Sequence, residues 1–222
     1  MVQMVGIRSI LKLIGGIATL LLFNGCHAGG KLTGEAGLEE PSLEASIPQA
    51  TITLPATNPF YTNTNSITIS GMCTLGYTVM LSGASTDTQP CTSTSFSFSV
   101  SENVDGVYSY LITQSSSNGN VSNPVSAVWI RKTSVPPPLI STPSISPYFS
   151  SQAILSITGS CESGATISLS GDGTGTTTCA ASAFTLNLPK GTDGDYNLTV
   201  TQTDQASNSA NASFVWKKRA LT

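Results

Sequence analysis

Charged residues are scarce in this chain of 222 residues. Lys, Arg, Asp and Glu make up only 9% of the sequence, and the nine basic side chains form no stripe that could follow a phosphate backbone. A nucleic-acid-binding domain needs such a clustered basic surface. The run Lys217, Lys218 and Arg219 near the C-terminus is interpreted as a solvated strand end. We therefore expect no nucleic-acid partner.

Histidine is almost missing, which excludes the commonest hydrolytic chemistry. The single histidine, His27, lies near the N-terminus, so the remainder of the chain offers no imidazole base for a serine or cysteine nucleophile. No Cys-x-x-Cys pair suggests tetrahedral zinc. The few carboxylates are scattered over predicted loops and do not form a hydrolytic pair. The sequence predicts no catalytic residue, no metal site, no cofactor and no enzymatic activity.

Helical periodicity is absent beyond residue 50, and a period of two replaces it. Leu155 and Ile157 alternate with Ser and Thr, as do Phe184, Leu186 and Leu188. Such alternation is typical of half-buried antiparallel strands, and β-branched Thr suits the wet face. Short strands separated by Gly, Asn and Asp turns predict β-sandwiches. The expected fold class is therefore all-β.

The chain contains two copies of one unit, offset by 88 residues. The offset pairs Cys73 with Cys161 and Cys91 with Cys179, together with the following further positions: Gly71 with Gly159, Gly76 with Gly164, Gly83 with Gly171, Phe96 with Phe184, Asp105-Gly106 with Asp193-Gly194, Tyr108 with Tyr196, and Thr113-Gln114 with Thr201-Gln202. A slip of one residue near Pro124 then aligns Trp129 with Trp216. Repeats of this kind predict two tandem domains of the same fold.

The N-terminus has the form of a secretory leader. Arg8 and Lys12 precede the 11 apolar or small residues 13–23, a run too short to span a bilayer comfortably. The run ends in "LFNGC", which resembles a bacterial lipobox, and the resemblance implies that Cys26 is lipidated and that the protein is sorted to the outer membrane. Cys26 is also the one cysteine without a partner in the repeat. The alternative is an ordinary signal peptide followed by an unrelated cysteine.

Composition divides the rest of the chain. We predict a signal peptide at 1–25 and a lipidated N-terminus with a flexible, Gly- and Glu-containing tether at 26–50. The two sandwich domains are placed at 51–133 and 139–218. The residues between them, 134–138, end in three consecutive prolines, which favour a stiff polyproline spacer.

The four repeated cysteines form one predicted disulfide in each domain. Neither a metal site nor a catalytic thiol has the partners it needs, whereas a disulfide needs only the oxidising compartment that the leader indicates. We expect Cys73 to pair with Cys91, and Cys161 with Cys179. On a chain-entropy estimate each bond contributes about 3 kcal/mol.

The segments "DGVYSYLITQS" and "DGDYNLTVTQT" resemble the turn and strand of bacterial immunoglobulin-like (Big-type) domains. The resemblance implies tandem immunoglobulin-like sandwiches in a cell-envelope protein. Asp105 and Asp193 are expected to hydrogen-bond the turn backbone, and Gly106 and Gly194 to adopt positive φ. Tyr108 and Tyr196 would form tyrosine corners. The tryptophans lie in the last predicted strand, unlike those of antibody domains.

These expectations lead to a lipid-anchored envelope protein that binds or adheres without catalysis. Its partners would be the membrane, through the N-terminal lipid, and a protein or glycan ligand of unknown identity. The alternative is a structural spacer or an assembly component of an envelope complex. A calcium site at Asp193, Asp195 and Asp204 is a further alternative, against the interpretation of these residues as solvated turns.

Overall fold

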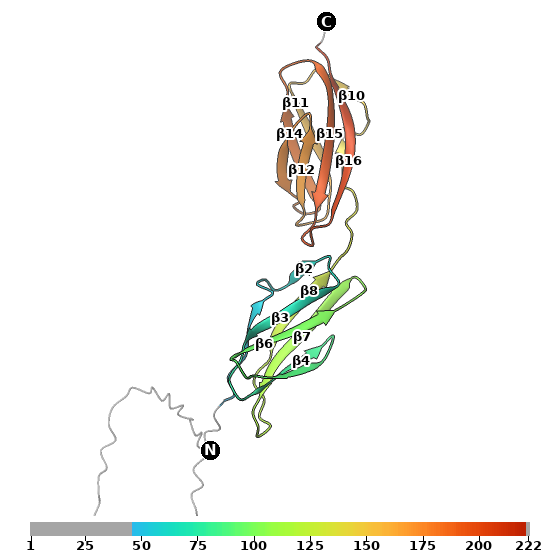
Figure 1. Cartoon of the computed structure of the whole chain (residues 1–222). Coiled ribbons are helices and arrows are strands. Elements are labelled where there is room, and N and C mark those ends of the chain that lie inside the picture. The colour runs from blue at the N-terminus through green and yellow to red at the C-terminus, as the bar shows by residue number, and fades with distance from the viewer. Residues whose placement is uncertain (1–45, 221–222) are drawn as a thin grey trace, which may run out of the picture. The chain divides into compact units, whose positions relative to one another are not determined.

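The computed structural model describes residues 46–220, which contain sixteen strands and no helix (Figure 1). They form two β-sandwiches in tandem, each with one three-stranded and one five-stranded sheet, and the predicted fold class is confirmed. The predicted signal peptide, Cys26 and the tether up to residue 45 lie outside the described residues. Among the described residues, no helix has the length and apolar character needed to cross a membrane.

The first sandwich pairs a three-stranded with a five-stranded sheet. The smaller sheet has the order β1 (Thr51–Leu54), β3 (Ser66–Met72), β6 (Ser95–Ser101). The larger has the order β2 (Phe60–Thr62), β8 (Val125–Arg131), β7 (Gly106–Ser115), β4 (Thr78–Gly83), β5 (Asp87–Pro90). Only the β2–β8 pairing is parallel. The first two strands belong to different sheets, β1 to the smaller and β2 to the larger.

The second sandwich repeats this topology. Its smaller sheet has the order β14 (Ala183–Pro189), β11 (Ile154–Ser160), β9 (Leu139–Thr142). Its larger sheet has the order β10 (Tyr148–Ser150), β16 (Ser209–Lys218), β15 (Gly194–Thr203), β12 (Thr166–Gly171), β13 (Gly175–Thr178). The β10–β16 pairing is again the parallel one.

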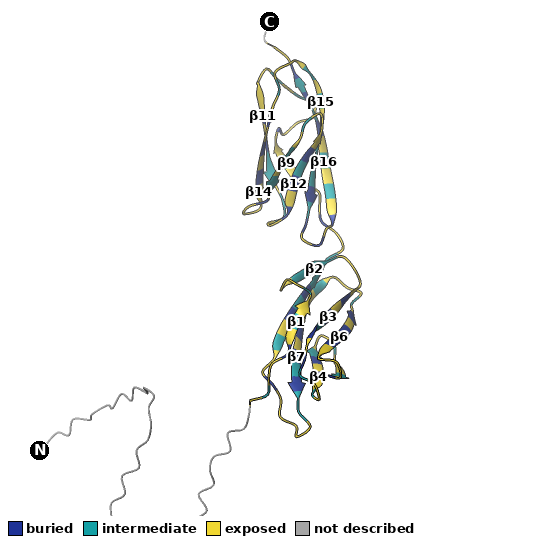
Figure 2. Cartoon of the chain, turned by 60° about the vertical axis from the view of Figure 1, so that its left-hand side comes forward, coloured by how far each residue is buried: buried dark blue, intermediate teal, exposed yellow. Residues whose placement is uncertain are grey.

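Side-chain alternation builds both cores, as Figure 2 shows by the change from buried to exposed along single strands. In β6, Phe96, Phe98 and Val100 point inward and the four serines point outward. Trp129 and Trp216 are fully buried in β8 and β16. Each packs against a tyrosine of the neighbouring strand, with ring centroids 5.5 Å apart for Tyr108 and 5.4 Å for Tyr196.

The paired glycines of the repeat have a packing reason. A Cβ on Gly71 would lie 1.8 Å from the Thr51 carbonyl oxygen, and one on Gly159 would lie 2.0 Å from that of Leu139. Both distances are far below van der Waals contact, so only glycine lets the first strand approach at this point.

Candidate functional site

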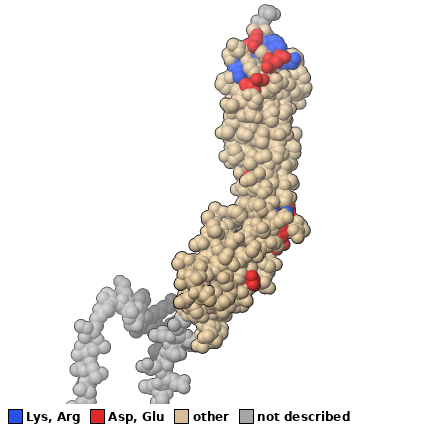
Figure 3. Space-filling model, in the orientation of Figure 1, with Lys and Arg blue, Asp and Glu red and all other residues tan. Residues whose placement is uncertain are grey.

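Each sandwich has two ends. We call "upstream end" the one that carries the loop between the first two long strands (β3–β4, β11–β12) and the loop of the last hairpin (β7–β8, β15–β16). We call "downstream end" the opposite one, where the chain leaves the last strand. Charged side chains gather where the chain passes from one sandwich to the next and at the downstream end of the second (Figure 3).

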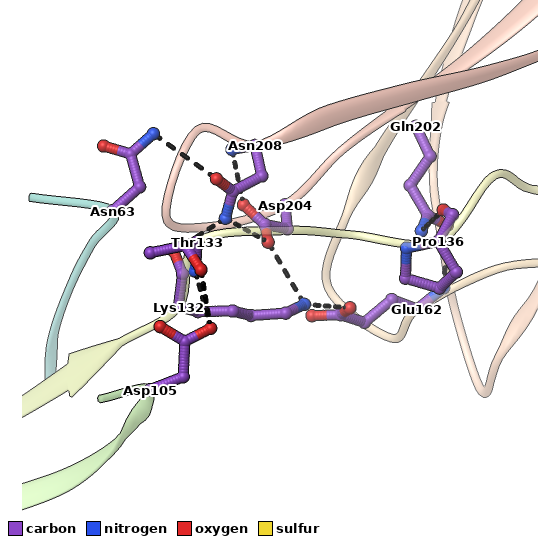
Figure 4. Close-up of polar contacts among 9 residues, drawn as sticks. All are labelled: Asn63, Asp105, Lys132, Thr133, Pro136, Glu162, Gln202, Asp204 and Asn208. Atoms are coloured by element: carbon purple, nitrogen blue, oxygen red, sulfur yellow. Dashed lines mark hydrogen bonds and ion pairs between the residues drawn. The ribbon is translucent and has the colours of Figure 1, made fainter. Parts of the chain in front are cut away.

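A three-residue ionic cluster lies where the chain leaves the first sandwich (Figure 4). Lys132 follows β8 directly, and its ammonium group forms ion pairs with Glu162 and Asp204. The Nζ to Asp204 Oδ2 distance is 3.1 Å. Glu162 belongs to the β11–β12 loop and Asp204 to the β15–β16 loop. Two loops of the second sandwich therefore hold one cation of the segment that precedes it.

Asn208 connects this cluster to the backbone. Its side-chain amide donates to the Lys132 carbonyl oxygen at 2.8 Å and to Asp204 Oδ2 at 3.0 Å. Its amide oxygen accepts a longer bond, 3.4 Å, from the side chain of Asn63 in the first sandwich. Asp204 and Asn208 are both buried, so these polar groups need the partners that they have.

The surroundings favour the charged forms of this cluster. Burial raises the pKa of Asp204, but hydrogen bonds from Asn208 and Lys132 outweigh it, and the pKa lies below its usual value near 3.8. Burial lowers the pKa of Lys132, whereas the bonds to Glu162 and Asp204 raise it, with a net result above 10.5. The pair is therefore ionised across the physiological pH range.

A buried glutamine fastens the chain at each upstream end. Gln202 accepts from the Glu162 backbone N–H at 2.8 Å and donates to the Pro136 carbonyl oxygen at 3.0 Å. Gln114 makes the same two bonds in the first sandwich, with Thr74 at 2.6 Å and Pro48 at 2.8 Å. The proline-containing linker is consequently bonded to the second sandwich at Pro136.

The two repeated aspartates fasten the chain at the downstream ends. Asp105 accepts from the backbone N–H and the hydroxyl of Thr133, both at 2.9 Å, and pairs with Arg131 at 2.6 Å. Asp193 likewise accepts from the Ala220 N–H at 2.6 Å and pairs with Lys218 at 3.1 Å. The backbone bond from Thr133 is the main cause that lowers the pKa of Asp105. These bonds go to the segment after the last strand and not to the turn, so the predicted turn role is wrong in this respect.

The expectation of positive φ at Gly106 and Gly194 is also wrong. Neither glycine is among the residues with positive φ. Each begins a strand, and a Cβ there would lie 3.4 Å from the ring or hydroxyl atoms of Tyr108 or Tyr196. The tyrosine hydroxyls donate to backbone oxygens four residues upstream, Val104 at 2.7 Å and Thr192 at 2.8 Å. This is the geometry of a tyrosine corner.

Both disulfides are present, Cys73–Cys91 and Cys161–Cys179, with Cα atoms 6.0 and 5.9 Å apart. Each joins the residue after the first long strand of the smaller sheet (β3, β11) to the residue after the short edge strand of the larger sheet (β5, β13). The bond therefore closes the two sheets at the upstream end, and it differs in position from the inter-sheet disulfide of antibody domains.

The three residues of the calcium alternative do not form one site. Asp193 and Asp195 lie at the start of β15, whereas Asp204 follows its last residue. A strand of this length separates them by roughly 30 Å. Asp195 pairs with Lys217 and Arg219, and Asp204 with Lys132. No group of three or more His, Cys, Asp or Glu side chains suited to a metal occurs in residues 46–220.

Sequence reasoning missed Lys132, Asn208 and the two glutamines. The signal for the glutamines was the repeated Thr-Gln pair at the end of a predicted strand. The signal for the ionic cluster was a difference within the repeat, because Glu162 and Asp204 replace Thr74 and Ser116 at the 88-residue offset. Only the fold shows that these two loops are neighbours and that Lys132 reaches both.

No protein-family model matches the sequence, and no curated protein matches it. Solved structures do resemble it in fold. Fibronectin(III)-like modules of CbhA from Clostridium thermocellum share 16% identity, with a TM-score of 0.45 over 77% of this chain and 94% of that one. A tetra-tandem repeat from the extending region of a large adhesion protein shares 17% identity, with a TM-score of 0.40 over 69% of this chain and 45% of that one. The FN1–FN3 domains of chicken CNTN1 share 13% identity, with a TM-score of 0.43 over 78% of this chain and 68% of that one.

Proposed function

We propose that the chain is a non-enzymatic binding or adhesion module of the cell envelope, anchored by a lipid on Cys26. The observation that carries the binding role is the outer face of the smaller sheet in the first sandwich. There the register pairs Ser66 with Ser101, Thr68 with Ser99, and Ser70 with Ser97. These side chains are exposed or half-exposed, and none is charged. A flat array of neutral hydroxyl groups suits a polar uncharged ligand such as a glycan or an exposed peptide backbone.

A charge introduced into this face tests the binding role. Thr68→Lys should abolish attachment of purified protein to its target cells or glycans, because the lysine would displace neutral hydroxyl contacts in the middle of the face. The matched control is Ser156→Lys, at the equivalent position of the second sandwich. Equal attachment of Thr68→Lys and the unaltered protein, in a folded sample, would contradict this assignment of the face.

A structural spacer is the second candidate, and the fastened linker favours it. Lys132, Thr133 and Pro136 each have a partner within one of the two sandwiches. A spacer needs a linker that resists bending, and these three contacts oppose bending. Co-purification with an envelope complex, together with no binding to cells or glycans, would favour this candidate over adhesion.

Location separates the two candidates in intact cells. Brief protease treatment, followed by detection of domain epitopes, should remove the signal while the inner envelope stays intact if the module acts at the surface. Protection until the outer membrane is permeabilised would turn the module inward and favour the spacer. Metabolic labelling with a fatty acid, compared with a Cys26→Ser variant, tests the lipid itself.

A further inference from the structure

The second sandwich pairs Lys132 with Glu162 and Asp204 at its upstream end, and the first sandwich has uncharged residues at the two matching positions. Glu162 and Asp204 correspond to Thr74 and Ser116 at the 88-residue offset. The hairpin loops are equivalent in detail, since the Ser116 N–H donates to Asn120 at 3.0 Å and the Asp204 N–H donates to Asn208 at 2.9 Å. The first sandwich therefore has the same loop framework without the acidic pair that receives a cation.

Apolar side chains occupy this end of the first sandwich instead. Leu75 is 62% exposed and Val121 is 55% exposed, and the matched positions in the second sandwich are Ser163 and Ser209. Met72, which is 59% exposed, corresponds to Ser160. Three serines in one copy are thus three large apolar residues in the other. Exposing large apolar side chains to water in place of serine hydroxyls is unfavourable, so contact with water does not explain these residues.

Leu75 and Val121 belong to adjacent loops, and Met72 is the last residue of β3. Val121 bridges to Ser115, and Ser115 pairs with Thr78, the first residue of β4 and three residues after Leu75. The described residues 46–86 and 106–130 contain no Lys, Arg, Asp or Glu. The face shown in Figure 3 accordingly carries no charge at this end. This end is uncharged, and it exposes three large apolar side chains beside polar ones such as Ser117 and Asn120.

We propose that this tip, Met72, Leu75 and Val121, rests on a lipid surface. The chain enters the sandwich here, because Gln114 holds the Pro48 carbonyl oxygen at 2.8 Å just before β1. Cys26 lies 20 residues before Ser46, the first described residue. A flexible chain of that length, which the composition predicts for this segment, has a reach of roughly 25 Å and would keep the tip at an effective concentration on the order of millimolar near its anchor. A weak apolar contact suffices at such a concentration. The proposal rests on the proposed N-terminal anchoring.

The test replaces the natural anchor, so its result does not depend on lipidation of Cys26. Residues 27–222, which contain both sandwiches entire, are attached through an N-terminal hexahistidine tag to phosphatidylcholine vesicles with nickel-chelating lipid. Brominated phosphatidylcholine then quenches tryptophans that reach the acyl region. Trp129 and Trp216 are fully buried and supply a constant background. Leu75→Trp should be quenched at least twofold more than Ser163→Trp, its match in the second sandwich.

Two further measurements decide the nature of the contact. Val121→Ser in the Leu75→Trp protein should reduce the additional quenching by about half, since it restores the residue of the second copy at a neighbouring position. Salt at 500 mM should leave the quenching unchanged, because the tip has no charge that ions could screen. Equal quenching of the Leu75→Trp and Ser163→Trp proteins, or loss of the quenching in 500 mM salt, would overturn the proposal. Failure of fatty-acid labelling at Cys26 would instead overturn the proposed anchoring.

Discussion

The Lys132 ammonium nitrogen lies 3.1 Å from the buried Asp204 carboxylate, although 72 positions separate the two residues. Lys132 belongs to the chain leaving the first sandwich and Asp204 to a loop of the second. The contact therefore links the stability of one sandwich to the residue that joins it to the other.

Lys132→Met should destabilise the second sandwich by about 1–2 kcal/mol, because the Asp204 side chain, only 1% exposed, would lose its cation. Partial exposure of Lys132 and Glu162 keeps the effect below that of a fully buried pair. Denaturant unfolding measures it. Lys132→Arg retains the charge and serves as the control. Unfolding midpoints that agree for both variants and the unaltered protein would show that the cluster does not stabilise the fold.

Acid should weaken the second sandwich through Asp204. Its folded pKa is lower than its usual value near 3.8, so its contribution is fully present above that value and is lost as pH falls through the folded pKa. The pKa values of Asp105, Asp193 and Asp195 are also lowered in the folded protein. Protonation of these three carboxylates in acid therefore lowers stability as well. Stability measured between pH 2 and 6 should therefore fall toward acid, and Asp204→Asn should show a shallower slope. An unchanged slope would assign the acid sensitivity to the other carboxylates.

Removal of the Cys73–Cys91 bond by a double alanine substitution should destabilise the first sandwich by about 2–4 kcal/mol. The closed loop is the same length in the second sandwich, so the Cys161, Cys179 double variant is the matched control. Calorimetry that resolves the two unfolding transitions should show each variant lowering a different one. A single variant that lowers both transitions equally would indicate that the sandwiches unfold as one unit.

Tyr110→Phe should leave the first sandwich as stable as before or stabilise it by up to about 1 kcal/mol. The Tyr110 hydroxyl is buried and has no hydrogen-bond partner among residues 46–220. An unpaired hydroxyl costs free energy that phenylalanine avoids. Burial, together with the negative charge of the nearby Glu102, raises the pKa of this phenol to about 12, although no hydrogen bond of normal geometry joins the two side chains. Absorbance titration should therefore find one tyrosine that ionises only at that extreme. The matched residue of the second sandwich, Leu198, is already apolar. A clear loss of stability in Tyr110→Phe would reveal a partner for the hydroxyl.

Asp105→Ala should speed hydrogen exchange at the Thr133 amide, because that N–H donates to the Asp105 carboxylate. Asp193→Ala should do the same at Ala220. Amides in the middle of β7, far from either carboxylate, are the internal control and should keep their protection. Unchanged exchange at Thr133 would mean that the segment is held by other contacts.

The sequence by itself determined the architecture. Alternating apolar residues, glycines at matched positions and paired cysteines are local or repeated signals, and each reports a requirement that one strand, turn or loop must satisfy. The two sandwiches, their disulfides and the burial of Trp129 and Trp216 follow from such signals. The all-β class needed no knowledge of which loops become neighbours.

Tertiary structure decided the partners of the polar side chains. Asp105 reads as a turn residue from its Asp-Gly motif, yet its carboxylate bonds Thr133, which lies 28 positions away. Lys132 carries no motif at all, and its role arises only because folding brings the β11–β12 and β15–β16 loops together around it. Hydrogen bonds and ion pairs depend on distances of a few ångströms between residues distant in sequence, and no periodicity encodes those distances.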